Sequence, residues 1–93
     1  MVQADQIIRL EAKSNYTRVY FTDQRPVLMA KVLRAYDEIL RPHGFVRAHR
    51  SHLINVRYID GIDAEGNVQM HDTSRVETSR RKRRDVIQMI LSA

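Results

Sequence analysis

The hydrophobic period of this chain changes along its length, and that change constrains the possible folds more than any other feature. The first third contains short segments that alternate apolar and polar residues or concentrate aromatic and β-branched ones, as half-buried strands do. These segments are 7–12, 16–21 and 27–30, and polar turns separate them. Ile8, Leu10 and Ala12 are predicted to face one side of the first strand. The first third is therefore predicted to be a β-meander.

The period then lengthens to about 3.6 residues, which predicts an amphipathic helix. Its apolar stripe comprises Val32, Leu33, Tyr36, Ile39 and Leu40, and Lys31, Arg34, Asp37 and Glu38 fall away from the stripe. Pro42 and Gly44 predict where the helix ends, since proline cannot continue the hydrogen-bond ladder and glycine accepts the left-handed geometry of a helix stop.

The second half is predicted to return to extended structure before a final helix. Its extended segments are a strand from Phe45 and the ranges 53–56, 58–62, 68–71 and 75–78. Ser79 is the candidate N-cap of the last helix, whose apolar stripe would be Val86, Ile87, Ile90 and Leu91. The fold class is therefore mainly β (α+β) with two helices. A chain of 93 residues forms one domain, and we expect residues 1–6 to be a disordered lead.

The composition favours an anionic partner. Sixteen Lys and Arg against eleven Asp and Glu give a formal charge of +5, which in so small a domain points towards nucleic acid. The absence of cysteine excludes disulfide scaffolds, thiolate metal sites and cysteine nucleophiles. No apolar run approaches the ~20 residues that span a bilayer, and no signal peptide is evident, so we expect a cytoplasmic location.

Two basic segments carry most of the excess charge. No acidic residue occurs from Ile39 to Ile59, a window that contains Arg41, Arg47, Arg50 and Arg57. The second segment, 79–84, has the sequence Ser-Arg-Arg-Lys-Arg-Arg and opens the last predicted helix. Cations are disfavoured at a helix start, by about 0.3–1 kcal/mol each, so five of them there suggest an anionic partner such as phosphate. A solubilising patch, a nuclear-import signal and an anionic membrane surface are weaker explanations.

The histidines do not form a convincing metal or catalytic site. In an extended segment His49 and His52 would point to opposite faces, and Arg47 and Arg50 would repel a cation. Ser51 lies between the two histidines, but the sequence offers no orienting carboxylate or oxyanion loop. We therefore predict no metal, no cofactor and no enzymatic activity.

Three blocks of the sequence resemble the signature of the LytTR DNA-binding domain family. They are Glu-Ala-Lys-Ser-Asn-Tyr at 11–16, Phe-Val-Arg-Ala-His-Arg-Ser-His-Leu-Ile-Asn at 45–55 and Ser-Arg-Arg at 79–81. The resemblance extends from about Ile7 to Leu91. It implies about ten short strands in three antiparallel sheets with little helix, and sequence-specific binding of double-stranded DNA by loops that enter the major groove. His52 stands where the family pattern leads us to expect an aromatic residue.

The resemblance also implies which residues contact DNA. The expected base contacts are Asn15, Thr17, Arg50 and Arg81, and arginine at the last two positions suits bidentate contact with guanine. The residues expected to contact phosphate or to position the loops are Lys13, Arg47, His49, Ser51, Arg80 and Lys82.

The expected partners follow from the same resemblance. Such domains form the output part of bacterial response regulators, bind paired DNA sites as dimers and usually follow a receiver or sensor domain, which these 93 residues do not contain. Two alternatives remain open: an RNA-binding module that stacks bases on Tyr16, Tyr20 or Phe21, and a basic domain that binds an acidic protein.

Overall fold

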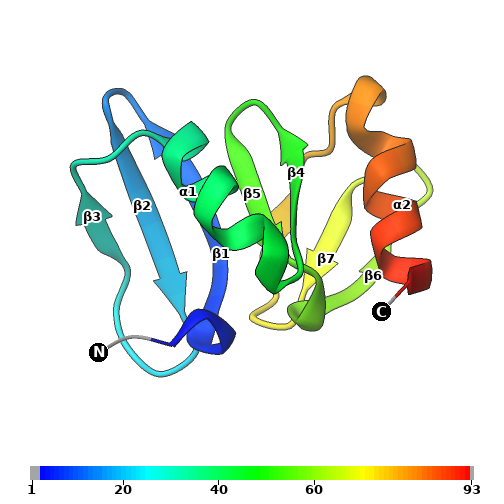
Figure 1. Cartoon of the computed structure of the whole chain (residues 1–93). Helices are drawn as coiled ribbons and strands as arrows, with labels where there is room; N and C mark the ends of the chain where they lie inside the picture. Colours follow the sequence, from blue (N-terminus) through cyan, green and yellow to red (C-terminus); the bar gives the residue numbers. More distant parts are fainter. Residues whose placement is uncertain (1–2, 93) are drawn as a thin grey trace.

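The computed structural model describes residues 3–92, which form two antiparallel sheets and two α-helices (Figure 1). The strands are β1 (Ile7–Lys13), β2 (Tyr16–Phe21), β3 (Val27–Met29), β4 (Phe45–His49), β5 (His52–Asn55), β6 (Ile59–Ile62), β7 (Val68–Met70) and β8 (Arg75–Val76). The helices are α1 (Leu33–Leu40) and α2 (Arg83–Ser92). Short 3-10 turns are η1 (Ala4–Gln6), η2 (Arg41–His43), η3 (Val56–Tyr58) and η4 (Arg80–Lys82).

The larger sheet has five strands in the order β3-β2-β1-β5-β4. The N-terminal meander supplies three of these strands, and the β4–β5 hairpin joins it because β5 pairs with β1. In that pairing Leu10 lies opposite Leu53, and both side chains are fully buried. The smaller sheet has the order β6-β7-β8.

Two hydrophobic clusters lie on opposite faces of the larger sheet. The first includes Leu10, Phe45 and Leu53 with Leu33 and Leu40 of α1. The second includes Val46 and Ile54, which neighbour Phe45 and Leu53 along the chain and therefore point the other way. Its other members come from the smaller sheet and α2: Val68, Met70, Val76 and Val86. The sheet is thus covered on one face by α1 and on the other by the small sheet and α2 (Figure 1).

The predicted fold class is confirmed, with two differences in detail. The described residues form eight strands in two sheets rather than about ten in three, because the β1–β5 pairing merges the meander and the β4–β5 hairpin into one sheet. Ala4–Gln6 form a 3-10 turn where a disordered lead was expected, and residues 1–2 of that lead lie outside the described part of the chain. Within residues 3–92, no helix has the length and apolar character needed to cross a membrane.

Several predicted faces are corrected by the structure. A bulge in β1 sets Ile7 and Arg9 opposite consecutive residues of β2, so Ile8 joins the cluster facing the small sheet while Leu10 faces α1. In α1, Asp37 is buried although we predicted it on the polar side. Of the predicted apolar stripe, Ile39 and Val32, which precedes the helix, are each 53% exposed.

The last helix also differs from its prediction. It buries Val86 and partly buries Met89 and Ile90, whereas Leu91 is 75% exposed. Its first turn is the 3-10 turn η4, and the Ser79 side chain makes no capping hydrogen bond there.

Asn55 offers a test of how the two halves of the larger sheet are held together. Its amide Nδ2 donates to the Ile7 carbonyl at 2.9 Å, and its Oδ1 accepts from the Arg57 N–H at 3.0 Å. The side chain is 3% exposed, so removing it leaves two polar groups without this partner. We expect Asn55→Ala to lower the free energy of unfolding by about 1–3 kcal/mol in urea denaturation. Gln88→Ala, on the exposed face of α2, should change the free energy of unfolding by less than about 0.5 kcal/mol. Equal losses in the two variants would show that Asn55 does not help to hold β1 and β5 together.

Candidate nucleic-acid interface

Three segments that are distant in sequence meet along one edge of the molecule. They are the β1–β2 turn (14–15), the β4–β5 turn (50–51) and the C-terminal basic segment (79–84), which lie along the top of Figure 1. Two backbone hydrogen bonds fix their relative positions. The Ala12 N–H donates to the Ser51 carbonyl at 2.9 Å, and the Ser79 N–H donates to the Ala48 carbonyl at 2.8 Å. The three predicted binding blocks are therefore neighbours in space.

Of the two base contacts predicted in this part of the chain, Asn15 is exposed in the β1–β2 turn and Thr17 is buried in β2. Lys13 pairs with Tyr16, which leaves a two-residue turn in which Ser14 has a φ of 57° and Asn15 is exposed. Thr17, in contrast, has 0% exposure, and its hydroxyl donates to the Lys31 carbonyl at 2.7 Å. The prediction that Thr17 contacts a base is therefore wrong, because its side chain belongs to the interior. Lys13 Nζ lies 3.6 Å from Glu11 Oε1.

Arg47 determines the shape of the β4–β5 turn. Its Nε donates to the His49 carbonyl at 2.9 Å, and its Nη2 donates to the Arg50 carbonyl at 2.6 Å. The side chain is only 19% exposed. Of the two roles predicted for Arg47, these contacts match loop positioning, whereas the Arg50 side chain extends into solvent.

His49, Ser51 and His52 complete this turn. His49 Nδ1 accepts a hydrogen bond from the Ser51 N–H at 3.1 Å, and its Nε2 lies 3.7 Å from a carboxylate oxygen of Glu77. His49 and His52 were predicted on opposite faces of one strand. The turn falls between them instead, so they pair across the hairpin with ring centroids 5.3 Å apart. Among residues 3–92, no group of three or more His, Cys, Asp or Glu side chains could hold a metal ion.

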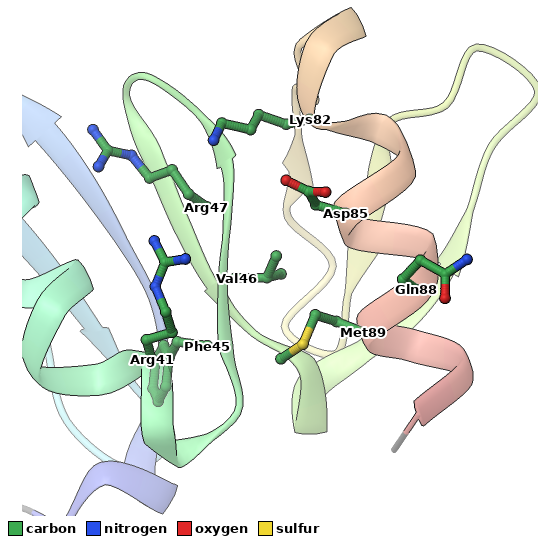
Figure 2. A pocket seen from close by; sticks show the side chains of 8 residues that line it. All are labelled: Arg41, Phe45, Val46, Arg47, Lys82, Asp85, Gln88 and Met89. Carbon is green, nitrogen blue, oxygen red and sulfur yellow. The ribbon is translucent and has the colours of Figure 1, made fainter.

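The C-terminal basic segment divides its cations between two directions. Arg80 and Arg81 are exposed, and Lys82 extends from the end of η4, just before α2, towards β4 and Arg47 (Figure 2). Arg83 instead donates from Nη2 to the Glu65 carbonyl at 2.8 Å, and its guanidinium packs against Gly66. The basic run therefore supplies Arg80, Arg81 and Lys82 to the edge, while Arg83 stabilises the β6–β7 turn.

A concave cavity of about 390 Å³ lies between the β4–β5 turn and the basic segment. Its lining consists of Arg47, His49 and Arg50 from the hairpin, Ser79, Arg81 and Lys82 from the C-terminal segment, and Asp37 from α1. Four of these side chains are cations and one is a carboxylate, so the cavity presents a positive potential to solvent. Such a surface attracts polyanions.

Asp37 and Arg41 are the site residues that sequence reasoning missed. Arg41 Nη2 donates to both carboxylate oxygens of Asp37, at 2.8 and 2.9 Å. Asp37 also lies 3.5 Å from Arg47 Nη1. The four-residue spacing of Asp37 and Arg41 was visible as a helical ion pair, but nothing local in the sequence indicates that Asp37 reaches β4.

Comparison with known proteins identifies the family to which this domain belongs. A small, mainly β domain with a basic edge built from turns has the properties of a nucleic-acid-binding module. The family model of the LytTr DNA-binding domain matches residues 1–91, so the chain belongs to the LytTR DNA-binding domain family. It is thus a DNA-binding domain of a kind that acts in transcription regulation.

A solved structure shares the fold. It is the LytTr DNA-binding domain of a protein from Bacillus cereus whose description is a methyl-accepting/DNA response regulator. The two chains are 25% identical and superpose with a TM-score of 0.82 over 96% of this chain and 84% of that one. No curated protein matches the chain.

The position of His52 predicts a pH dependence of stability. Burial lowers the pKa of His52 below its usual value, His49 and Arg9 lower it further, and Glu11 and Glu77 oppose the shift. The unfolded chain therefore binds a proton at His52 more readily than the folded one. We expect the free energy of unfolding to fall as the pH drops below about 6.5, the ordinary histidine pKa.

The matched variant for this prediction is His52→Phe, which keeps an aromatic ring and removes the titration. Urea denaturation at several values between pH 8 and pH 5 should show a shallower loss of stability for His52→Phe than for the wild type. Parallel pH profiles of the two proteins would show that His52 has the same pKa in the folded and unfolded states.

Proposed function

We propose that this domain binds double-stranded DNA sequence-specifically, by inserting the β1–β2 turn, the β4–β5 turn and the C-terminal basic segment into the major groove. The observation that carries the proposal is the convergence of Arg50 and Arg81 on one concave, positively charged edge, although 31 positions separate them in the sequence (81 − 50). Both side chains are free to extend from the surface, since both residues are exposed.

The proposed roles follow from exposure and hydrogen bonding. Arg50 and Arg81 contact base edges, where a guanidinium can donate two hydrogen bonds to guanine. Asn15 contacts DNA from the β1–β2 turn, which is held beside the β4–β5 turn through the Ala12–Ser51 hydrogen bond. Arg80, Lys82 and Lys13 contact phosphates, which set the register of the protein on the duplex.

The remaining predicted residues shape the turn that carries Arg50. Arg47 fixes the carbonyls of His49 and Arg50, and the His49 ring accepts from the Ser51 N–H. These three residues therefore act mainly by positioning the turn.

The biological setting is part of the same proposal. The structural neighbour belongs to a response regulator by its description, and we infer that this domain likewise forms the output part of a bacterial transcription regulator in the cytoplasm. We infer further that it acts on paired sites as a dimer, with an upstream receiver or sensor domain that controls it.

Arg50→Ala and Arg81→Ala test the base contacts. A duplex selected from a random pool by the wild-type domain serves as the cognate site. Each substitution should weaken binding to that duplex by about 1–3 kcal/mol, or roughly 5- to 150-fold, because a good bidentate base contact supplies this much discrimination. Binding to random duplex should weaken less, as measured by fluorescence anisotropy.

Arg25→Ala is the matched control, since Arg25 is exposed in the loop between β2 and β3 at the opposite end of the larger sheet (Figure 1). It should leave the preference for the selected duplex intact. If the Arg50 and Arg81 variants lost affinity equally for selected and random duplex, the proposal that these residues contact bases would be wrong. If single-stranded or structured RNA outcompeted the selected duplex at equal salt, DNA would not be the preferred ligand.

Lys82→Ala tests a phosphate contact by its salt dependence. A lysine that neutralises one phosphate releases about one counterion, so its removal should reduce the slope of log K against log salt by about 1. Affinity should fall on every duplex by a similar factor. A loss confined to the selected duplex would instead place Lys82 at a base.

A further inference from the structure

We propose that Asp37 is a positioning residue for the β4–β5 turn, and that it acts through Arg47 to increase sequence discrimination while lowering affinity for DNA in general. The inference about DNA rests on the proposed function. The inference about the turn can be tested on the free domain.

The carboxylate of Asp37 lies at the centre of a chain of contacts from α1 to the turn. It belongs to a residue that is only 8% exposed, near the middle of the helix. Arg41 binds both of its oxygens, and Arg47 Nη1 lies 3.5 Å from one of them. Figure 2 shows Arg41 and Arg47 on the same side of β4. The Asp37 carboxylate lies within 3.5 Å of both guanidinium groups.

Arg47 links the Asp37 carboxylate to the β4–β5 turn, because its guanidinium contacts both. A guanidinium is planar, so fixing Nη1 at Asp37 also fixes the directions in which Nε and Nη2 donate. Those two groups bind the carbonyls of His49 and Arg50. Asp37 therefore constrains the backbone from which the Arg50 side chain projects, although it lies 13 positions away in the sequence (50 − 37).

The sign of the electrostatic effect makes the proposal testable. Asp37 lines the same cavity as Arg50, Arg81 and Lys82, so its negative charge repels phosphate. If the carboxylate had only this effect, its removal would strengthen binding to every duplex equally. If it only stabilised the fold, its removal would weaken binding to every duplex. A positioning residue gives opposite changes on the two kinds of duplex.

The decisive variant is Asp37→Asn, which keeps the size of the side chain and removes its charge. Glu38→Gln is the matched control, because it removes the same charge from the next residue of α1, which is exposed. Both are measured in the whole 93-residue domain, against the selected duplex and against random duplex.

We expect Asp37→Asn to raise affinity for random duplex about twofold to threefold, since one repulsive charge near the phosphates is lost. We expect the ratio of selected to random affinity to fall about tenfold, which is part of the discrimination that one bidentate base contact supplies. In the free domain, the backbone amide signals of residues 49–51 should shift in NMR spectra. The ratio for Asp37→Glu should lie between those of the wild type and Asp37→Asn. Glu38→Gln should have the same ratio as the wild type.

Three results would overturn the proposal. They are unchanged amide signals of residues 49–51, an equal change in both affinities, and a loss of affinity on both duplexes that parallels a lower melting temperature. If Asp37→Asn does not fold, Arg47→Lys decides instead. That variant keeps the positive charge and removes the guanidinium fork, so it should lower the ratio, and an unchanged ratio would refute the coupling. A wild-type domain without preference for any duplex would refute the proposed function alone, because the amide signals still report on the turn.

Discussion

The pairing of β5 with β1 is the constraint on which the rest of the structure depends. It joins the N-terminal meander to the β4–β5 hairpin and places Leu10 opposite Leu53 in the centre of a five-stranded sheet. The antiparallel register also brings the end of β1 to the start of β5, where the Ala12 N–H donates to the Ser51 carbonyl. The two turns that are proposed to contact DNA are therefore neighbours because of sheet register. The C-terminal segment joins them through a similar bond between Ser79 and Ala48.

The proposed binding edge combines a mostly buried, hydrogen-bonded arginine with exposed cations. Arg47 is mostly buried and bound to two carbonyls, whereas Arg50, Arg80 and Arg81 are exposed. Clustering cations in a free domain is unfavourable, because they repel one another across the cavity. DNA bound at this edge, as proposed, would relieve that repulsion, and the carboxylate of Asp37 offsets part of it at the base of the turn. A single buried acid thus fits the chemistry of a cavity that is also lined by the cations Arg47, Arg50, Arg81 and Lys82.

The sequence predicted the elements well and their faces less well. Alternation and turn residues located the strands of the meander and the hairpin from Phe45, and the change to a helical period located α1, since these signals are local. The bulge at Ile8 and the burial of Thr17 and Asp37 depend on neighbours that are distant in sequence. Arg50 and Arg81 were singled out as base contacts by resemblance to a family and not by either basic segment alone. Ser79, which makes no capping hydrogen bond, and the exposed Leu91 show that helix ends are hardest to predict from local pattern.

The central claim is that one edge, built from three segments, contacts DNA. Backbone amide chemical shifts of the labelled domain, followed during titration with a selected duplex, test it most directly. The account predicts that the largest changes occur together at residues 14–16, 48–51 and 79–82, with small changes in β6, β7 and the C-terminal half of α2. Large changes centred on the smaller sheet, or changes at only one of the three segments, would contradict it.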